Sequence, residues 1–377
     1  MKIAFISNFL NHHQLPFCLE LNNKNDVEYY FIATEEIPQE RINLGYEDMN
    51  AKYDFVIETY KSKEKEEEAL KIINDSDFVI IGSAPEKYIQ KRIKDNKITF
   101  RYSERIFKKG FLRPSTIRII IDLIKRKIKY INKKEYMLCA SAYTKKDYSV
   151  AGLYKNKYYK WGYFPATKKY NIENLIQVKE KNEVIKLLWA ARFIDWKHPE
   201  LVVELAKELK KGNYKFKIEM LGCGEMLEEI NEKIKQYELS DVVETIGAVQ
   251  SAQVREYMEN ANIFLVTSDQ NEGWGAVVNE AMNSGCAIVG NKKIGSIPYL
   301  IKDGKNGLTY SNKEEFFSKV KYLFDNDEER KAISKNAYNT IVEVWNAKNA
   351  TDNLIKLCKS LMNNQNININ EGPCSKE

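Results

Sequence analysis

The sequence predicts an α/β protein built from two doubly wound parallel sheets. Short apolar runs typical of buried strands alternate with amphipathic segments typical of helices, beginning with Lys2–Ser7 and then Leu15–Leu21. The chain has 377 residues, enough for two domains of ordinary size that each bury a core. A hydrophobic content of 44% and a charged content of 30% are those of a soluble globular protein.

Composition and charge argue against several other classes of protein. The net charge of +6 is modest, and no aromatic-basic RNA motif accompanies the basic residues, so nucleic acid is not an expected partner. Six scattered cysteines without a C-x-x-C pair, and only three histidines, argue against a zinc site and for a reduced, cytoplasmic setting. The apolar start Met1–Leu10 is broken by Asn8 and has no small-residue cleavage site after it, so a first strand is expected rather than a signal peptide. No apolar run approaches the roughly 20 residues needed to span a bilayer.

The first half of the chain reads as one doubly wound domain over residues 1–165. Strands are expected at Lys2–Ser7, Val27–Ala33, Phe55–Ile57, Asp77–Gly82, Ile98–Arg101, Met137–Ala140 and Trp161–Pro165. Helices are expected at Leu15–Leu21, Ser62–Ile73 and Ser141–Asp147. Because these strands are expected to be parallel, their carboxyl ends meet at one edge of the sheet, where ligands bind in such folds.

Two polar loops at this edge supply candidate substrate contacts. The loop after the first strand carries Asn11, His12 and His13, for which ordinary loop residues are the alternative. The strand at residue 98 runs into Ser103 and Glu104. Glu104 is the candidate of this domain for contact with reacting groups, and its alternative role is an ion pair with Arg101 or Arg105.

Residues 107–134 form a second notable stretch, in which isoleucines and other apolar residues are interleaved with Lys and Arg. Pro114 suits the first turn of a helix. The pattern predicts a basic amphipathic helix of the kind that lies on anionic membrane surfaces. The alternative is a helix packed on the core with its basic face in water.

A polar segment without clear periodicity, residues 166–182, is the predicted linker, and a second domain is expected over 183–346. Its strands are expected at Ile185–Ala190, Phe216–Leu221, Val242–Gly247, Ile263–Ser268 and Cys286–Gly290. Its helices are expected at Glu200–Lys211, Gln253–Asn260, Ala276–Ser284, Lys313–Phe324 and Glu328–Val344. A terminal helix is expected at Ala347–Leu361, followed by a polar tail, Asn363–Glu377, that we expect to be frayed.

The stretch from Glu272 to Glu280 is the centre of the predicted chemistry. It lies at a strand-loop-helix junction, with one carboxylate in the loop and one in the second turn of the helix. The free N–H groups of that helix favour an anion such as a diphosphate. Arg192 and Lys197, in the loop after an earlier strand, can neutralise a diphosphate as well. The alternative is a tight loop with two ordinary glutamates.

This stretch resembles the Glu-x7-Glu signature of the family 4 (group 1) glycosyltransferases, which are retaining enzymes with a GT-B fold. The resemblance rests on Glu272-Gly273-Trp274-Gly275, Glu280-Ala281-Met282 and Gly285, and it is strong from about Leu187 to Gly307. A GT-B fold implies two Rossmann-like doubly wound domains facing across a cleft. Residues 1–165 would be the acceptor domain and 183–346 the nucleotide-sugar donor domain, with the helix at 347–362 packing back on the first.

The resemblance also implies roles for single residues. Arg192 and Lys197 would contact the phosphates of the donor, Glu272 would act on the donor sugar as a catalytic residue, and Glu280 would hold the ribose hydroxyls. The same resemblance puts further positions on the donor side, namely Gly273, Trp274, Gly275, the turn at Gly222 and the loop at Ile294. In place of a histidine that many relatives carry, this chain has Ser103 and Glu104, and the form Tyr-Ser-Glu-Arg resembles a subgroup linked to surface-polysaccharide synthesis.

The expected activity is therefore that of a retaining hexosyltransferase in surface-polysaccharide synthesis. It would take a UDP- or GDP-linked sugar as its substrate, with no cofactor, and transfer the sugar to a glycan or a lipid-linked acceptor. No Asp-x-Asp lies beside the site, so we predict independence of metal and a front-face mechanism with the leaving phosphate as base. The expected location is cytoplasmic, on the inner face of the cell membrane. Other interpretations are a phosphorylase, a nucleotide-sugar epimerase and a non-catalytic sugar-binding or membrane-binding protein.

Overall fold

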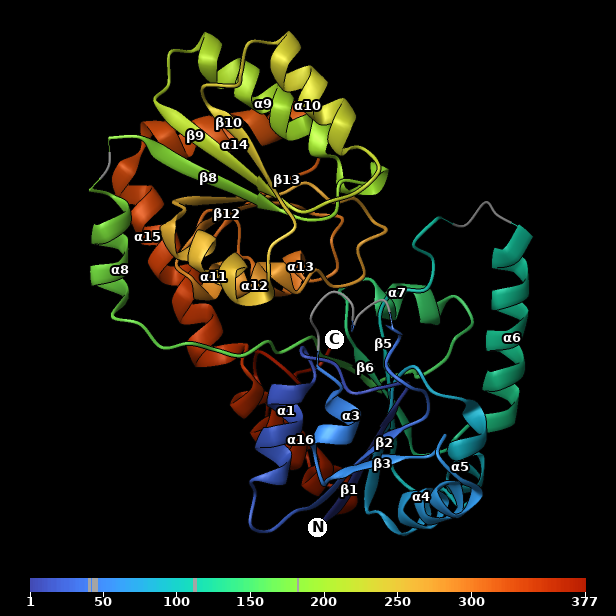
Figure 1. Cartoon of the computed structure of the whole chain (residues 1–377). Coiled ribbons are helices and arrows are strands. Elements are labelled where there is room, and N and C mark those ends of the chain that lie inside the picture. Colours follow the sequence, from blue (N-terminus) through green and yellow to red (C-terminus); the bar gives the residue numbers. More distant parts are fainter. Residues whose placement is uncertain (40–41, 43–46, 111–113, 182) are drawn as a thin grey trace. The chain divides into compact units, whose positions relative to one another are not determined.

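The computed structural model describes residues 1–39, 42, 47–110, 114–181 and 183–377, and it contains two compact units (Figure 1). Unit 1 comprises Met1–Ala166 together with Trp345–Glu377, and unit 2 comprises Thr167–Val344. Positions 111–113 of the predicted basic stretch and position 182 of the predicted linker lie outside the described residues. Within the described residues, no helix has the length and apolar character that crossing a membrane requires.

Unit 1 is built on a parallel sheet in which the described residues supply seven strands, in the order β3-β2-β1-β4-β5-β6-β7. The strands are β1 (Lys2–Ser7), β2 (Glu28–Ala33), β3 (Val56–Glu58), β4 (Phe78–Ile81), β5 (Thr99–Ser103), β6 (Glu135–Cys139) and β7 (Tyr158–Lys160). Chain order reverses between β1 and β4, which is the switch point of a doubly wound fold. The last strand was predicted at Trp161–Pro165 and lies three residues earlier, because Tyr158 and Tyr159 are buried against β6.

Helices cover both faces of this sheet (Figure 1). They are α1 (Leu15–Asn22), α3 (Met49–Lys52), α4 (Lys63–Asp75), α5 (Gln90–Lys94), α6 (Pro114–Tyr130), α7 (Thr144–Ser149) and α16 (Ala347–Met362), with a 3-10 turn, η1 (Glu86–Tyr88). The helix α16 packs on α1, and Lys24 forms a 2.5 Å ion pair with Asp352 there. The end of the chain therefore belongs to unit 1.

The C-terminal tail is an ordered part of unit 1, which contradicts the expectation that it is frayed. The amide of Lys160 donates to the carbonyl of Ser375 over 2.8 Å, and the amide of Cys374 donates to the carbonyl of Lys160 over 2.7 Å. Lys376 pairs with Tyr159 as an antiparallel bridge. The tail covers the open edge of β7, and satisfying those edge groups explains why a polar segment is held in place.

The predicted linker is also regular over part of its length, since Ile172–Lys179 form helix α8. Asn171 caps this helix by accepting a hydrogen bond from the amide of Asn174. Ile172 and Ile176, one turn apart, are buried against Tyr338 of unit 2. The sequence did not reveal this helix because it presents only one turn of apolar spacing.

Unit 2 is a second doubly wound parallel sheet, with the strand order β10-β9-β8-β11-β12-β13 in the described residues. The strands are β8 (Ile185–Ala190), β9 (Phe216–Leu221), β10 (Val243–Gly247), β11 (Ile263–Val266), β12 (Ala287–Asn291) and β13 (Leu308–Tyr310). Chain order reverses between β8 and β11, so this pair of strands flanks the switch point of unit 2. The prediction of two Rossmann-like doubly wound domains is confirmed.

Helices cover both faces of this second sheet (Figure 1). They are α9 (Pro199–Lys211), α10 (Leu227–Gln236), α11 (Ser251–Asn260), α12 (Val277–Asn283), α13 (Ile297–Leu300), α14 (Lys313–Asp325) and α15 (Asp327–Asn339). A 3-10 turn, η2, spans Asp195–Lys197, and a π-helical turn, Thr340–Val344, follows α15. One apolar core of unit 2 includes Trp189, Phe193 and Phe216.

Candidate active site

The switch point of unit 2 brings together two predicted site residues that lie far apart in the sequence. Lys197 follows β8, Glu272 follows β11, and the Lys197 ammonium forms an ion pair with the Glu272 carboxylate. The two side chains are only 13% and 16% exposed. The pair lies at the carboxyl edge of a doubly wound sheet, beside its switch point. Such folds bind their ligands at this place.

Arg192 and Lys197 both contact the ring of Trp196, a residue that the sequence analysis did not name as a candidate. The Lys197 ammonium is 4.4 Å from the centre of the Trp196 ring, and the Arg192 guanidinium is 5.9 Å from the same centre. The indole face therefore attracts both cations. Two cations and one carboxylate leave a net positive charge at this point, which favours an anionic ligand.

The loop after β8 is fixed by the loops on either side of it. On one side, the amide of Phe193 donates to the carbonyl of Cys223 over 2.9 Å. On the other, the amide of Asp269 donates to the carbonyl of Trp196 over 3.0 Å. These hydrogen bonds join three loops at the carboxyl edge of the sheet, and they hold the backbone that carries the two cations before any ligand arrives.

Gly222 makes this close approach of loops feasible. A Cβ atom at position 222 would lie 1.9 Å from the carbonyl oxygen of Ala191, and the backbone there has φ +133°. Only glycine accepts both conditions. The sequence analysis predicted that Gly222 lies on the donor side. In the structure Gly222 packs against the backbone of Ala191 in the loop after β8.

The loop around Trp274 and Gly275 is also tightly packed. The Trp274 side chain is fully buried, and its indole N–H donates to Asn279 Oδ1 over 2.9 Å. Gly275 has φ +84°, and a Cβ there would lie 3.3 Å from Glu272 Cγ and 3.2 Å from Ile294 Cγ2. Gly273, Trp274 and Ile294 are all buried, and they pack around the loop that carries Glu272.

Glu280 lies on α12, one turn into a helix that is shorter than predicted. The helix has seven residues, Val277–Asn283, so its dipole contributes less than the sequence analysis assumed. Burial raises the pKa of the Glu280 carboxyl, and Arg255 on α11 partly offsets the effect. In the described part of the chain no cation lies within 4 Å of this carboxylate, so it is a half-buried acid that can accept hydrogen bonds from a ligand.

Another titratable group, His198, adjoins the same loop. Its backbone is left-handed, with φ +50°, and its Nδ1 lies 3.0 Å from Glu200 Oε1. Asp269 Oδ2 lies 3.6 Å from the other ring nitrogen. Hydrogen bonding to Glu200 raises the pKa of His198 above its usual value. The histidine thus ties the loop after β8 to the loop after β11.

Unit 1 has its own group of polar side chains at the carboxyl edge of its sheet. Tyr163 donates a 2.7 Å hydrogen bond to Glu104 Oε1, and Lys108 forms a 2.7 Å ion pair with Glu104 Oε2. Neither alternative partner of Glu104 is correct. Arg101 pairs with Glu86 and Glu135, and Arg105 lies 3.9 Å from Asp147.

Tyr163 also joins the two predicted loops of unit 1. The His13 ring stacks on the Tyr163 ring with centres 5.8 Å apart, and His12 packs against His13 at 3.7 Å. Asn11 is structural, because its Oδ1 accepts hydrogen bonds from the amides of His13 and Gln14. Sequence reasoning missed Tyr163, since the residue was assigned to a strand.

A polar cavity of about 310 Å³ opens beside this group within unit 1. Ser103 lines it and donates to the carbonyl of Glu104 over 2.8 Å, while the Tyr148 hydroxyl donates to Ser103 Oγ over 3.0 Å. The remaining lining includes Arg101, Glu104, Arg105, Lys108 and Tyr163. Hydroxyl and charged groups that converge on one cavity suit a polyhydroxylated ligand.

Within the residues that the structure describes, no three His, Cys, Asp or Glu side chains group together in a way that could hold a metal ion.

Part of the chain is similar in sequence to a known protein family. Residues 171–340, nearly all of unit 2, match the family Glycosyl transferases group 1. A putative colanic acid biosynthesis glycosyltransferase, WcaL of Salmonella typhimurium, is 30% identical over 135 residues, which are 34% of this chain and 33% of that protein. An uncharacterized glycosyltransferase of Methanocaldococcus jannaschii, MJ1069, is 29% identical over 194 residues, 50% of this chain and 48% of that one. The chain thus spans between a third and a half of the length of these two relatives.

Similarity of fold extends over nearly the whole chain. The crystal structure of Anabaena Alr3699/HepE in complex with UDP has a TM-score of 0.68 and 13% sequence identity. The match covers 96% of this chain and 100% of that chain. At this identity the likeness concerns the fold alone, and the fold is the GT-B arrangement of two Rossmann-like domains.

Proposed function

We propose that the protein is a glycosyltransferase that takes a sugar from a nucleoside-diphosphate sugar and transfers it to a glycan or a lipid-linked acceptor. The observation that carries the proposal is the Lys197–Glu272 ion pair beside Arg192 at the switch point of unit 2. The family match over unit 2 supports the reaction class. The name of the WcaL relative, which refers to colanic acid biosynthesis, supports a role in polysaccharide synthesis.

The donor would lie with its diphosphate against Arg192 and Lys197. A diphosphate competes with Glu272 for the Lys197 ammonium, because both are anions that need the same cation. Once Lys197 pairs with phosphate, the Glu272 carboxylate is released to accept hydrogen bonds from hydroxyls of the donor sugar. Glu280, a half-buried acid without a cation within 4 Å in the described residues, suits the ribose hydroxyls.

We further propose a retaining, family 4 reaction by front-face attack. The bond between the anomeric carbon and the phosphate oxygen breaks, and the acceptor oxygen bonds to that carbon from the same side. The leaving phosphate takes the proton of the acceptor hydroxyl. Arg192 and Lys197 stabilise the leaving diphosphate through their charges, so the proposal needs no metal ion.

On the acceptor side, the cavity of unit 1 offers Glu104, Tyr163 and Ser103 to hydroxyl groups. Tyr163 and Lys108 hold the Glu104 carboxylate in one orientation, as a positioned acceptor of hydrogen bonds must be held. His13 stacks behind Tyr163 and fixes its ring. Glu104 would orient the acceptor, and His12 and His13 would shape the rim.

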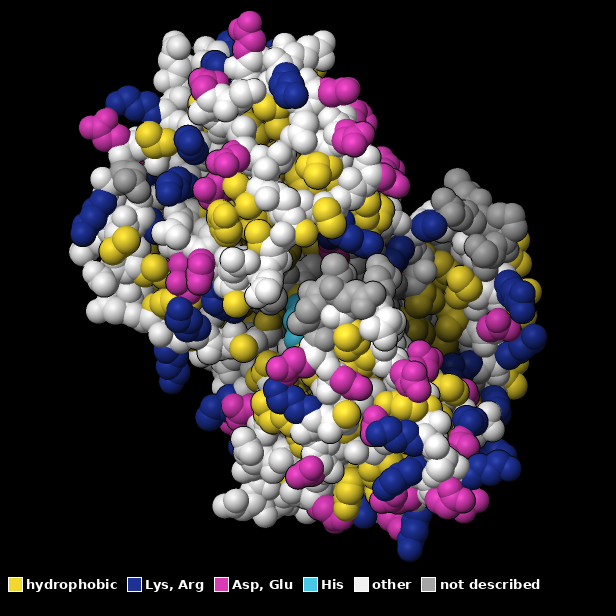
Figure 2. Space-filling view, in the orientation of Figure 1, with side chains coloured by type: hydrophobic (Ala, Val, Ile, Leu, Met, Phe, Trp, Pro, Cys, Tyr) yellow, Lys and Arg dark blue, Asp and Glu magenta, His cyan; other side chains and the backbone are white. Residues whose placement is uncertain are grey.

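We also propose that α6 rests on the anionic inner surface of the cell membrane, which suits a lipid-linked acceptor. One face of α6 packs on the core through Leu123, with Ile119 and Ile120 beside it. The other face exposes Ile117, Ile121, Ile124 and Ile128, and the exposed Ile131 extends this isoleucine row directly after the helix. Arg118, Lys125 and Lys129 lie next to them, and Figure 2 shows hydrophobic and basic side chains together over α6. Apolar side chains bordered by cations suit an anionic bilayer.

A thermal-shift panel of nucleotide sugars and free nucleotides, with and without EDTA, tests the proposal. A UDP-linked or GDP-linked sugar should raise the melting temperature by binding the native state. The shift should survive EDTA and disappear in Glu280→Ala. If no nucleotide shifts the wild-type protein at millimolar concentration, the proposal is wrong.

A further inference from the structure

A second cavity in unit 1, of about 400 Å³, lies away from the candidate active site. It opens where α6 ends and where β6 and β7 begin, since Tyr130, Glu135 and Lys157 line it. This is the amino edge of the parallel sheet, opposite to the edge that carries Ser103 and Glu104. We refer to it as the lysine pocket, after Lys127, Lys133, Lys155 and Lys157, which line it.

The lysine pocket has an excess of positive charge. In the described part of the chain, none of its four lysines has a carboxylate within 4 Å. Lys157 donates to the carbonyl of Lys133, and Lys133 donates to the carbonyl of Lys94, so both amines contact only neutral acceptors. Burial lowers the pKa of Lys157, and the negative charge of Glu135 offsets only part of this effect.

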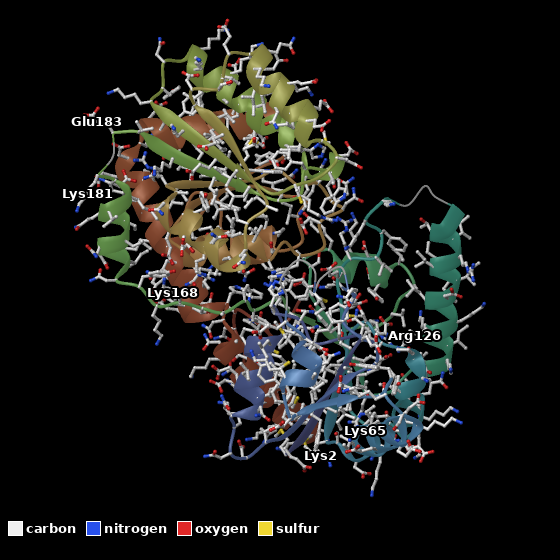
Figure 3. All side chains as sticks on the ribbon, in the orientation of Figure 1. Lys2, Lys65, Arg126, Lys168, Lys181 and Glu183 are labelled. Atoms are coloured by element: carbon white, nitrogen blue, oxygen red, sulfur yellow. The ribbon has the colours of Figure 1, made fainter. Side chains whose placement is uncertain are left out.

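The single acid of the pocket does not neutralise these lysines. Glu135 forms ion pairs with Arg126 of α6 and with Arg101 of β5. Glu86 pairs with the same two arginines at 2.5 and 2.6 Å, so two carboxylates balance two guanidinium groups. Arg126, labelled in Figure 3, ties α6 to the sheet in this way. The positive charges of the four lysines are therefore not balanced by these two carboxylates.

The backbone around the pocket is held in conformations that cost free energy. Asn132, Tyr154 and Asn156 have φ of 65°, 51° and 61°, and Gly152 has φ of 65°. Asparagine and glycine accept the left-handed region readily, whereas a tyrosine is strained in it. The Lys127 amine lies against Gly152, at 2.6 Å from the place where a Cβ would be. The strained segment thereby brings the amine of a helix residue and two lysines of the following loop to one cavity.

We infer that the lysine pocket binds a phosphate-bearing anion. Four ammonium groups without carboxylate partners around one concave site match the several oxygens of a phosphate group, and each supplies up to three donors. Tyr130 and Ile131 add an apolar wall. Because Ile131 also belongs to the exposed isoleucine row of α6, a lipid headgroup can reach the pocket from that row, and a soluble phosphate can reach it from water.

Residue-resolved labelling of lysines in the full-length protein tests this inference. An amine-reactive reagent modifies the lysines, and mass spectrometry gives the extent for each one with and without a ligand at constant ionic strength. The soluble probe is inorganic pyrophosphate. The lipid probes are phosphatidylcholine vesicles that carry either phosphatidic acid, a phosphomonoester, or phosphatidylglycerol at matched surface charge.

Pyrophosphate or phosphatidic acid vesicles should protect Lys127, Lys133, Lys155 and Lys157 several-fold more than Lys63 and Lys71, two exposed lysines of α4 away from the pocket and from α6. Protection by vesicles at lipid concentrations where pyrophosphate is ineffective identifies a headgroup, and the reverse identifies a soluble anion. Equal protection of all six lysines, or protection of none, overturns the inference, since the first outcome is general charge attraction.

A pair of double variants with the same loss of charge sharpens the test. Lys127→Gln with Lys155→Gln removes two pocket cations and should weaken binding about tenfold. Lys63→Gln with Lys71→Gln removes two exposed cations of α4, away from the pocket and from α6, and should change it less than about twofold. Equal weakening in both would contradict a defined pocket.

The outcome does not depend on the transferase proposal. Binding of pyrophosphate at the proposed donor site of unit 2 is read from the protection of Lys197 in the same labelling experiment. If only Lys197 is protected by pyrophosphate, the lysine pocket is refuted and the donor site is supported. If only the pocket lysines are protected, the lysine pocket is supported and the donor site is refuted.

Discussion

Lys197 and Glu272 form a largely buried ion pair across the switch point of unit 2, although 75 positions separate them in the sequence. The pair joins the loop after β8 to the loop after β11, so neither charge is free to move alone. A ligand with a diphosphate has to exchange one partner of this pair for another. Binding of the donor phosphates and release of Glu272 are therefore coupled.

This coupling predicts opposite effects on binding and turnover in Glu272→Gln. The variant should bind a free nucleoside diphosphate at least as tightly as the wild type, because Lys197 loses its competing carboxylate. Turnover of the nucleotide sugar should fall by about 10²-fold or more, because hydrogen bonds to the sugar in the transition state are weakened. Affinity by calorimetry and turnover by release of the nucleotide measure the two effects. Glu244→Gln, an exposed carboxylate on β10, is the matched control and should change neither.

The locked loops of unit 2 predict that Gly222→Ala is severely destabilising. The added Cβ would meet the carbonyl of Ala191 at 1.9 Å, so the two loops must separate, at a cost of about 3 kcal/mol or more. Gly304→Ala is the control for backbone strain alone, since Gly304 has φ +77° and nothing within 4 Å of its Cβ position. Its cost should be about 1–2 kcal/mol. Urea unfolding compares the two, and equal costs would mean that the loops are not locked.

Much of the fold could be predicted from the sequence because the strands are short, apolar and separated by amphipathic helices. The predicted strands at Lys2–Ser7, Ile185–Ala190 and Phe216–Leu221 agree with β1, β8 and β9 to the residue. The errors lie where tertiary contacts decide the structure. Helix α8 depends on burial against Tyr338, and the tail is held by the edge of β7.

The sequence analysis could name residues of the candidate site, but it could not predict which of them contact one another. Lys197, Arg192 and Glu272 were named from their positions after apolar runs, but their convergence through Trp196 has no signal in the sequence. Glu104 was named too, yet its partners are Tyr163 and Lys108 rather than Arg101 or Arg105. Partner choice depends on how neighbouring loops fold, which local patterns do not encode.

The raised pKa of Glu280 predicts that this carboxyl makes the stability of the protein depend on pH. Burial raises the pKa of this carboxyl above the usual 4.5, so the folded state favours the protonated form. Stability from this group is present below pH 4.5 and is lost as the pH rises through the raised pKa. Glu280→Gln should therefore raise the melting temperature at pH 8 by a few degrees, about 2–4 °C, and have little effect near pH 4.5. Scanning calorimetry at the two pH values measures this, and a variant that is less stable than the wild type at pH 8 contradicts the assignment.

Lys179 predicts that the helix found inside the expected linker is an integral part of unit 2. Its ammonium is buried and donates to the carbonyls of Met258, Ser284 and Gly285 at 2.7–3.0 Å. Lys179→Met leaves these acceptors unsatisfied and should lower the free energy of unfolding by about 2–4 kcal/mol. Lys181→Met, at an exposed lysine just beyond α8 that Figure 3 labels, should change it by less than about 0.5 kcal/mol. Denaturant titration of both variants decides whether α8 is anchored in this way.

The most direct test of the central claim is a calorimetric titration of the full-length protein with UDP and with GDP, in the presence of EDTA. The account predicts saturable binding of at least one of them at a single site. It also predicts about tenfold weaker binding in Lys197→Gln and unchanged binding in Lys217→Gln, which removes an exposed lysine on β9. An absence of binding at millimolar nucleotide, or binding that Lys197→Gln leaves unchanged, would contradict a diphosphate site at the switch point of unit 2.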